Sequence, residues 1–122
     1  VLLVDDEETV RAVGKRMLSR LGFEVLLAND GREAVEVYKA NRDRIVCVLL
    51  DLTMPHMDGE SAFRELRVLD GKVRVVLSSG YNEQEATSRF TGKGLAGFLQ
   101  KPYRAQDLID KVRGVVGKSG ST

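Results

Sequence analysis

Short apolar runs alternate with longer amphipathic segments along this chain. The runs are rich in Val, Ile and Leu and cover residues 1–4, 23–28, 45–50, 73–77 and 97–99. Between them, apolar residues recur at the three-to-four-residue spacing of helices that bury one face. Buried apolar runs that alternate with such helices are typical of a parallel sheet covered by helices on both faces. We therefore expect an α/β fold, a (βα)5 three-layer sandwich with a five-stranded parallel sheet.

Local signals mark several helix ends. Gly22 follows the first apolar helical face and is a typical helix terminator. Asp30, with Glu33 three residues later, forms a capping pair for the second helix. Asp70 and Gly71 close the third.

The last two expected helices differ in their apolar faces. The fourth carries only Ala86 and Phe90 inward, so we expect it to be the least firmly packed. The fifth has a clear apolar stripe, made of Leu108, Ile109, Val112, Val115 and Val116. We expect one domain over residues 1–117, and a frayed tail or the start of a linker over residues 118–122.

Chemically active side chains follow four of the predicted strands. Asp5 and Asp6 follow the first, Asp51 the third, Ser78 the fourth, and Lys101 lies just after the fifth. The carboxyl ends of parallel strands meet at one edge of the sheet, where open α/β folds bind ligands. We therefore expect these side chains to converge.

The expected cluster suits a magnesium-dependent phosphoryl site. Three carboxylates would repel one another unless a cation lay between them, and oxygen ligands are those that Mg²⁺ prefers. The Lys101 ammonium and the Ser78 hydroxyl could bind phosphoryl oxygens. Asp51, at the end of the central strand, is the best-placed nucleophile.

Composition adds limits on location and partners. The 19 basic and 18 acidic residues give a net charge of +1, which offers no broad electrostatic basis for binding nucleic acid or a membrane surface. The one cysteine, Cys47, cannot form an internal disulfide and suits a reducing compartment. No apolar run approaches the roughly 20 residues that cross a bilayer. We expect a cytoplasmic location, and a chain that is a piece of something longer.

Four motifs in this order and spacing resemble the receiver domains of two-component response regulators. They are Val4-Asp5-Asp6-Glu7, the segment from Leu50 to Gly59, Leu77-Ser78-Ser79-Gly80 and Gln100-Lys101-Pro102. The resemblance covers the chain from residue 1 to about residue 116. It implies the flavodoxin-like strand order 2-1-3-4-5, which a chemotaxis receiver exemplifies.

The resemblance also implies a role for each residue of the cluster. Asp51 would accept a phosphoryl group from a phosphohistidine of a sensor histidine kinase or a histidine phosphotransfer domain. Asp6, Asp51 and the backbone carbonyl of Thr53 would ligate Mg²⁺ or Mn²⁺, with Asp5 holding a metal-bound water. Lys101 would pair with the phosphoryl group. The domain would be a signalling module that catalyses its own phosphorylation rather than a turnover enzyme.

A switch follows from the same resemblance. Ser78 matches the hydroxyl that moves toward the phosphoryl group, and Phe98 matches the aromatic residue that turns inward with it. Together they would alter the surface formed by helix four, strand five and helix five, through which a homodimer could also form. By the same resemblance, Thr53 and Gly80 would flank the path of the attacking water, and neither could readily orient it, so we expect modest self-dephosphorylation.

Three alternatives stay open at this point. A haloacid-dehalogenase-like phosphatase would need a second acid two residues after its nucleophile, where Thr53 follows Asp51. A flavodoxin-like cofactor module would need a phosphate-binding loop after strand one, where the acidic residues 5–8 have the wrong charge unless a metal intervenes. A receiver-like interaction module that takes no phosphate would not need all the acids, the hydroxyl and the lysine.

The output is not encoded in these residues. The chain could be a stand-alone receiver, the first domain of a regulator or the receiver of a hybrid histidine kinase. The segments Leu77-Ser78-Ser79-Gly80-Tyr81 and Lys101-Pro102-Tyr103 resemble hybrid-kinase receivers most.

Overall fold

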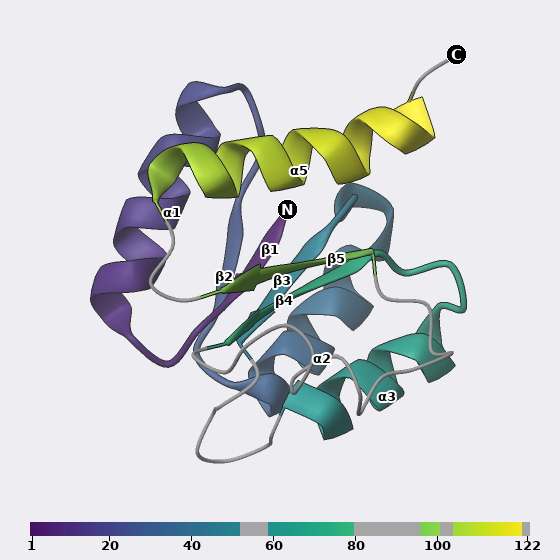
Figure 1. Ribbon diagram of the computed structural model, residues 1–122. Coiled ribbons are helices and arrows are strands. Elements are labelled where there is room, and N and C mark those ends of the chain that lie inside the picture. Colours follow the sequence, from purple (N-terminus) through teal and green to yellow (C-terminus); the bar gives the residue numbers. More distant parts are fainter. Residues whose placement is uncertain (52–58, 80–95, 101–103, 121–122) are drawn as a thin grey trace.

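Five parallel strands form one sheet in the order β2-β1-β3-β4-β5, as predicted. The computed structural model describes residues 1–51, 59–79, 96–100 and 104–120. The strands are β1 (Leu2–Val4), β2 (Leu26–Ala28), β3 (Val48–Asp51), β4 (Val75–Ser79) and β5 (Gly97–Gln100). Their arrows all run the same way in Figure 1. Side chains that directly follow a strand are thereby brought to the same edge of the sheet.

The helices cover both faces of the sheet. Helices α1 (Glu8–Arg20) and α5 (Ala105–Gly120) lie on one face, and α2 (Gly31–Asn41) and α3 (Gly59–Leu69) lie on the other (Figure 1). A single 3-10 turn, η1 (Arg42–Arg44), follows α2 and was not predicted. The expected fourth helix lies outside the described residues. The backbone of α5 runs past residue 117, so the expected frayed tail is helical up to Gly120.

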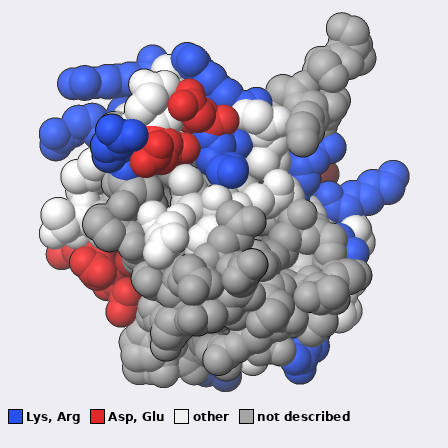
Figure 2. Space-filling view, viewed as in Figure 1, with Lys and Arg blue, Asp and Glu red and all other residues white. Residues whose placement is uncertain are grey.

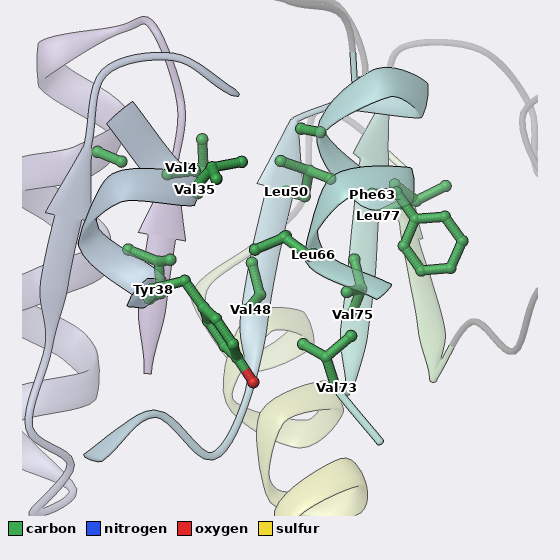
Figure 3. Packing of buried hydrophobic residues seen from close by; sticks show 14 of the residues in the cluster. Val4, Val35, Tyr38, Val48, Leu50, Phe63, Leu66, Val73, Val75 and Leu77 are labelled. Carbon is green, nitrogen blue, oxygen red and sulfur yellow. The ribbon is translucent and has the colours of Figure 1, made fainter. Parts of the chain in front are cut away.

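The sheet separates two clusters of buried apolar side chains. Side chains alternate along a strand, so Val48 and Leu50 of β3 pack with α2 and α3, whereas Leu49 packs with α1 and α5. The α2/α3 cluster, drawn in Figure 3, includes Val4, Val35, Tyr38, Phe63, Leu66, Val75 and Leu77. The α1/α5 cluster includes Leu3, Leu18, Val76, Leu108, Val112 and Val115. The three layers predicted from the sequence are thus confirmed.

The predicted helix ends are confirmed by their hydrogen bonds. Gly22 has φ +92°, the left-handed conformation that glycine adopts most readily. Its N–H donates to the Ser19 carbonyl at 3.0 Å, and the Phe23 N–H donates to the Leu18 carbonyl at 3.1 Å, which completes a Schellman motif. At the start of α2, the Asp30 side chain accepts a hydrogen bond from the Glu33 N–H at 2.9 Å.

Strand β2 is shorter than the predicted run of residues 23–28. It lies at an edge of the sheet, and its neighbour β1 begins at Leu2, which pairs with Leu26. Residues before this point have little of β1 left to pair with. Strand length is therefore limited by the neighbouring strand rather than by the apolar run.

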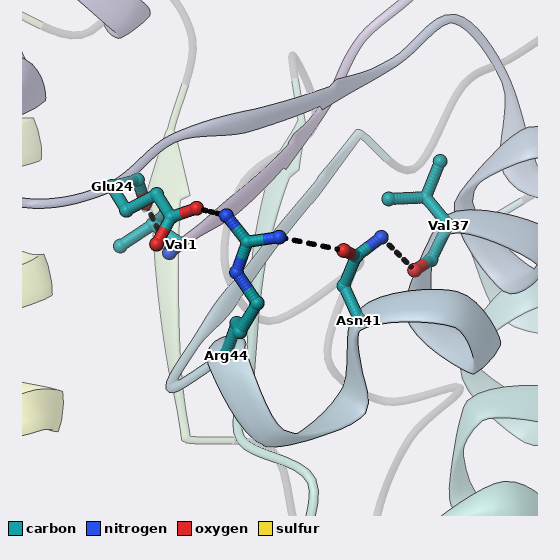
Figure 4. A network of polar contacts seen from close by, with 5 residues as sticks. All are labelled: Val1, Glu24, Val37, Asn41 and Arg44. Atoms are coloured by element: carbon teal, nitrogen blue, oxygen red, sulfur yellow. Dashed lines mark hydrogen bonds and ion pairs between the residues drawn. The ribbon is translucent and has the colours of Figure 1, made fainter.

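Polar contacts hold the chain around η1. Arg44 forms an ion pair with Glu24 and donates to Asn41 Oδ1 at 3.2 Å, and Asn41 Nδ2 donates to the Val37 carbonyl at 3.0 Å (Figure 4). The Val1 nitrogen donates to the Glu24 carbonyl at 2.8 Å. The charged side chains are about half exposed, and exposed ion pairs contribute roughly 0–1 kcal/mol. The contacts fix the path of the chain more than they stabilise the fold.

The remaining sequence expectations concern Cys47 and the membrane. Cys47 is 1% exposed, and burial raises the pKa of its thiol to about 12, so the group stays a neutral thiol at neutral pH. Among the described residues, no helix combines the length and the apolar character that crossing a bilayer requires.

Tyr38 joins α2 to the turn after α3. Its hydroxyl donates to Asp70 Oδ2 at 2.8 Å, and Asp70 Oδ1 accepts the Lys72 N–H at 2.9 Å. The Lys72 bond and then the Tyr38 bond hold the pKa of Asp70 below its ordinary value. Burial, with the Asp70 bond, raises the pKa of Tyr38.

We expect Tyr38→Phe to lower the free energy of unfolding by about 1 kcal/mol at neutral pH, because the Asp70 carboxylate loses a donor. The pKa of Asp70 is lowered in the folded protein, so its stabilising contribution is present above its unfolded pKa and is lost as pH falls through the folded value. The difference between the two proteins should therefore narrow in acid. Urea unfolding at neutral and acidic pH measures this, and a difference that persists unchanged in acid would contradict it.

Candidate functional site

Three carboxylates meet at the carboxyl edge of the sheet. Asp5 and Asp6 follow β1, Asp51 ends β3, and the two strands are neighbours in register, with Val4 opposite Leu50. One oxygen from each carboxylate lies within 4.8 Å of the other two. The convergence predicted from the sequence is confirmed for these residues.

Burial and chemistry make the cluster fit a divalent cation. Asp5 and Asp51 are each 1% exposed, whereas Asp6 is exposed, so the cluster has a buried floor and a side open to solvent. Burying carboxylates is costly unless positive charge or donors compensate. An all-oxygen donor set suits Mg²⁺, which commonly keeps several waters on its open side. The side chains present therefore fit the expected magnesium site.

Asp5 is fixed on both sides of its peptide. Its Oδ1 accepts a hydrogen bond from the Glu7 N–H at 3.0 Å, and its own N–H donates to the Ala28 carbonyl at 3.2 Å. The first bond lies in the turn into α1, and the second extends the pairing with β2. Hydrogen bonds to β2 and to the turn before α1 therefore hold the backbone and side chain of Asp5 in place.

Ser78 lies beside Asp51. The two residues are paired in the register of β3 and β4, whose backbones lie about 4.8 Å apart in such sheets. Ser78 is 6% exposed, so a hydroxyl and a carboxylate are held next to each other at the edge of the core. The predicted proximity of these two residues is confirmed.

Phe98 lies in β5, opposite Leu77 of β4. It is 8% exposed and belongs to the α2/α3 cluster. A groove of about 790 Å³ runs along β5 and α5, with Phe98 and Gln100 on the strand and Asp107 and Lys111 on the helix among its lining residues. The aromatic residue thus contacts both the core and a surface hollow.

Three expected site residues cannot be placed. Lys101, Thr53 and Gly80 lie outside the described residues, and so does the surface that helix four would contribute. Their roles stay predictions.

Arg11 is a neighbour of the cluster that no sequence motif indicated. Its Nη1 donates to the Asp5 backbone carbonyl at 2.5 Å and to Asn29 Oδ1 at 3.0 Å. The partner on Asp5 is a backbone atom, so no side-chain pattern signals the contact. The sequence feature that could have pointed to Arg11 is an arginine one turn into the helix that follows an acidic pair.

Comparison with known proteins agrees with this geometry. The family model described as response regulator receiver domain matches residues 1–113. The chemotaxis protein CheY of Bacillus subtilis is 33% identical over 92% of this chain and 92% of its own length. The sensor kinase CckA of Brucella abortus is 35% identical over 97% of this chain, which spans only 12% of that kinase. The regulator PrrA of Mycobacterium tuberculosis is 34% identical over the whole chain, which spans 52% of it.

Solved structures show the same fold. The CheX–CheY–BeF3–Mg complex of Borrelia burgdorferi matches with a TM-score of 0.87 and 30% identity, over 93% of this chain and 86% of that one. A response regulator receiver domain protein of Clostridium thermocellum matches with a TM-score of 0.88 and 27% identity, over 97% and 94% of the two chains. With its carboxylate cluster and parallel sheet, this chain belongs to the response regulator receiver domain family.

Proposed function

We propose that this domain accepts a phosphoryl group on Asp51 in a magnesium-dependent step of a two-component phosphorelay. One observation carries the proposal: the carboxylate oxygens of Asp5, Asp6 and Asp51 lie within 4.8 Å of one another. The pairing of Asp51 with Ser78 on the next strand supports it, since it sets a hydroxyl beside the acceptor. The domain is a signalling module rather than a turnover enzyme.

The transfer is a displacement at phosphorus. An Asp51 carboxylate oxygen attacks the phosphorus of a phosphohistidine, the new P–O bond replaces the P–N bond, and the imidazole leaves with the bonding electron pair. Asp6, Asp51 and the Thr53 carbonyl would hold Mg²⁺, with Asp5 orienting a metal-bound water. When bound, the ion offsets the charge that gathers on the phosphoryl oxygens.

The residues of the chain position the nucleophile and the phosphoryl group. Asp51 is held at the end of a fully buried strand, so its carboxylate needs little reorganisation before attack. The Ser78 hydroxyl donates to one phosphoryl oxygen, and the Lys101 ammonium pairs with another. Thr53 and Gly80 offer little help to an attacking water, so the phosphoryl group on Asp51 is lost slowly.

The signal leaves through the surface of β5 and its neighbours. Movement of Ser78 toward the phosphoryl group frees space that Phe98 enters, which changes the face made by helix four, β5 and α5. The groove between β5 and α5 lies on this face. A homodimer through the same face is a second use of the surface.

The partners we propose are a sensor histidine kinase or a histidine phosphotransfer domain in the cytoplasm. The match to part of the sensor kinase CckA supports a hybrid-kinase setting, and the match to PrrA supports a regulator. In Figure 2 acidic and basic side chains lie side by side over α1 and α5, and the net charge is +1. This mixed surface favours protein partners over nucleic acid.

Intact mass after incubation with acetyl phosphate tests the proposal. With Mg²⁺ or Mn²⁺ we expect a gain of one phosphoryl group per chain, and with excess chelator we expect none, because no cation is then present to offset the charge of the phosphoryl oxygens. No adduct in Mg²⁺, with a known receiver labelled in parallel, calls for a second trial with phosphorylated kinase. Failure there too would favour a phosphorylation-independent interaction module.

A further inference from the structure

We infer that Arg11 is a positioning residue for the cation site, and that it acts through the backbone of Asp5. The inference rests on the proposed function, because it concerns the metal that the proposed reaction needs. It goes beyond that function in assigning the geometry of the acidic turn to a residue outside the ligand set.

One guanidinium nitrogen joins two loops that precede helices. Arg11 lies in α1 and is partly buried, and its Nη1 contacts the Asp5 carbonyl at 2.5 Å and Asn29 Oδ1 at 3.0 Å. Asp5 lies between β1 and α1, and Asn29 lies between β2 and α2. Arg11 therefore ties the acidic turn to the neighbouring loop.

The neighbouring loop is itself anchored. The Asn29 N–H donates to Glu33 Oε1 at 3.0 Å, while the Glu33 N–H donates to Asp30 Oδ1 at 2.9 Å. These reciprocal bonds lie at the start of α2 and resemble a capping box. The difference is that the Glu33 side chain accepts from the N–H of Asn29 rather than from the N–H of the N-cap residue Asp30. Arg11 thus braces Asp5 against the end of a helix rather than against a loose loop.

The braced carbonyl belongs to the peptide between two expected metal-site residues. Asp5 and Asp6 lie on either side of it, so its orientation sets the directions in which both side chains leave the backbone. The Asp5 N–H is bonded to Ala28 and its Oδ1 to the Glu7 N–H. Arg11 adds a restraint on the carbonyl.

A positioning role and a purely electrostatic role for Arg11 predict opposite changes in cation affinity when Arg11 is removed. If Arg11 acted only through its positive charge, its removal would strengthen cation binding, because like charges repel. If it positions Asp5 and Asp6, its removal weakens binding despite the lost repulsion. Residues that orient metal ligands typically contribute 10- to 100-fold in affinity.

The test is calorimetric titration with Mg²⁺ of the wild-type domain, Arg11→Met and Arg11→Lys. We expect the Kd of Arg11→Met to rise about tenfold, and that of Arg11→Lys to rise less, because an ammonium can reach the carbonyl but lacks the planar fork. Two controls should keep the wild-type Kd. Arg16→Met removes the same charge from an exposed position of α1, and Tyr38→Phe destabilises the fold away from the cluster.

The outcomes separate the two proposals. Absence of Mg²⁺ binding by the wild-type domain would overturn the proposed function and this inference with it. Binding by the wild type together with an unchanged or lower Kd in Arg11→Met would overturn the inference alone. If Arg11→Met does not fold, Arg11→Lys decides: a raised Kd supports the positioning role, and a wild-type Kd overturns it.

Discussion

Replacing Asp51 by asparagine is expected to abolish the phosphoryl adduct while leaving the domain folded. Asparagine has nearly the same size and shape, so the end of β3 can keep its pairing with Ser78. The amide carries no negative charge and no carboxylate nucleophile, so the P–O bond cannot form. Of the variants considered, this one has the largest expected effect on activity.

The fold of this variant carries a second expectation. Asp51 is 1% exposed and shares a cluster with two other carboxylates, so a neutral side chain relieves repulsion. In chelator, Asp51→Asn should therefore unfold at a temperature equal to or above that of the wild type. Intact mass with acetyl phosphate and Mg²⁺, together with thermal unfolding, measures both effects.

A matched control is available in η1. Asp43→Asn makes the same chemical change at an exposed position before β3 begins, at the opposite end of that strand. It should label like the wild type. An adduct of equal yield in Asp51→Asn and Asp43→Asn would place the phosphoryl group on another residue and contradict the proposed acceptor.

Truncating Phe63 to alanine is expected to cost about 3–5 kcal/mol of the free energy of unfolding. The ring is 1% exposed in the α2/α3 cluster, to which Leu77 of β4 also belongs (Figure 3). Its removal loses apolar burial and leaves a cavity that neighbouring side chains fill only in part. Domains of this size are stable by about 5–15 kcal/mol, so a large share of the margin is lost.

Val68 provides the comparison within the same helix. It is 84% exposed, so Val68→Ala should change the free energy of unfolding by less than about 0.5 kcal/mol. Urea unfolding of the three proteins measures the difference. Equal midpoints for Phe63→Ala and wild type would show that the α2/α3 cluster does not depend on this ring.

The sheet and the carboxylate cluster were accessible from sequence for a shared reason. Apolar runs define strands, and parallel strands must all end at the same edge, so Asp5, Asp6 and Asp51 had to meet if the strands were correct. Ser78 followed by the same logic, and in the structure it pairs with Asp51 in the register of β3 and β4. The meeting of these residues depends on the fold alone and not on the details of loops.

Other features depend on contacts that a linear pattern does not contain. The length of β2 is limited by where β1 begins, and η1 is held by polar contacts of Arg44 with Asn41 and with Glu24, which is remote in sequence. Arg11 binds a backbone carbonyl, which leaves no trace in side-chain spacing. The roles of Lys101 and Thr53 rest on the family resemblance and stay predictions.

The separation of the core into the α2/α3 and α1/α5 clusters has a consequence for how such a domain can diverge. A buried substitution in α1 or α5 changes packing within the α1/α5 cluster, and it affects α2 and α3 only through the sheet between them. Binding specificity on the α1/α5 side can thus change by mutation independently of binding specificity on the α2/α3 side. β1, β3, β4 and β5 contribute residues to both clusters, so a substitution in one of these strands can affect both helical layers. The acidic residues lie at the ends of β1 and β3, so their backbone is held by strands that both helical layers constrain.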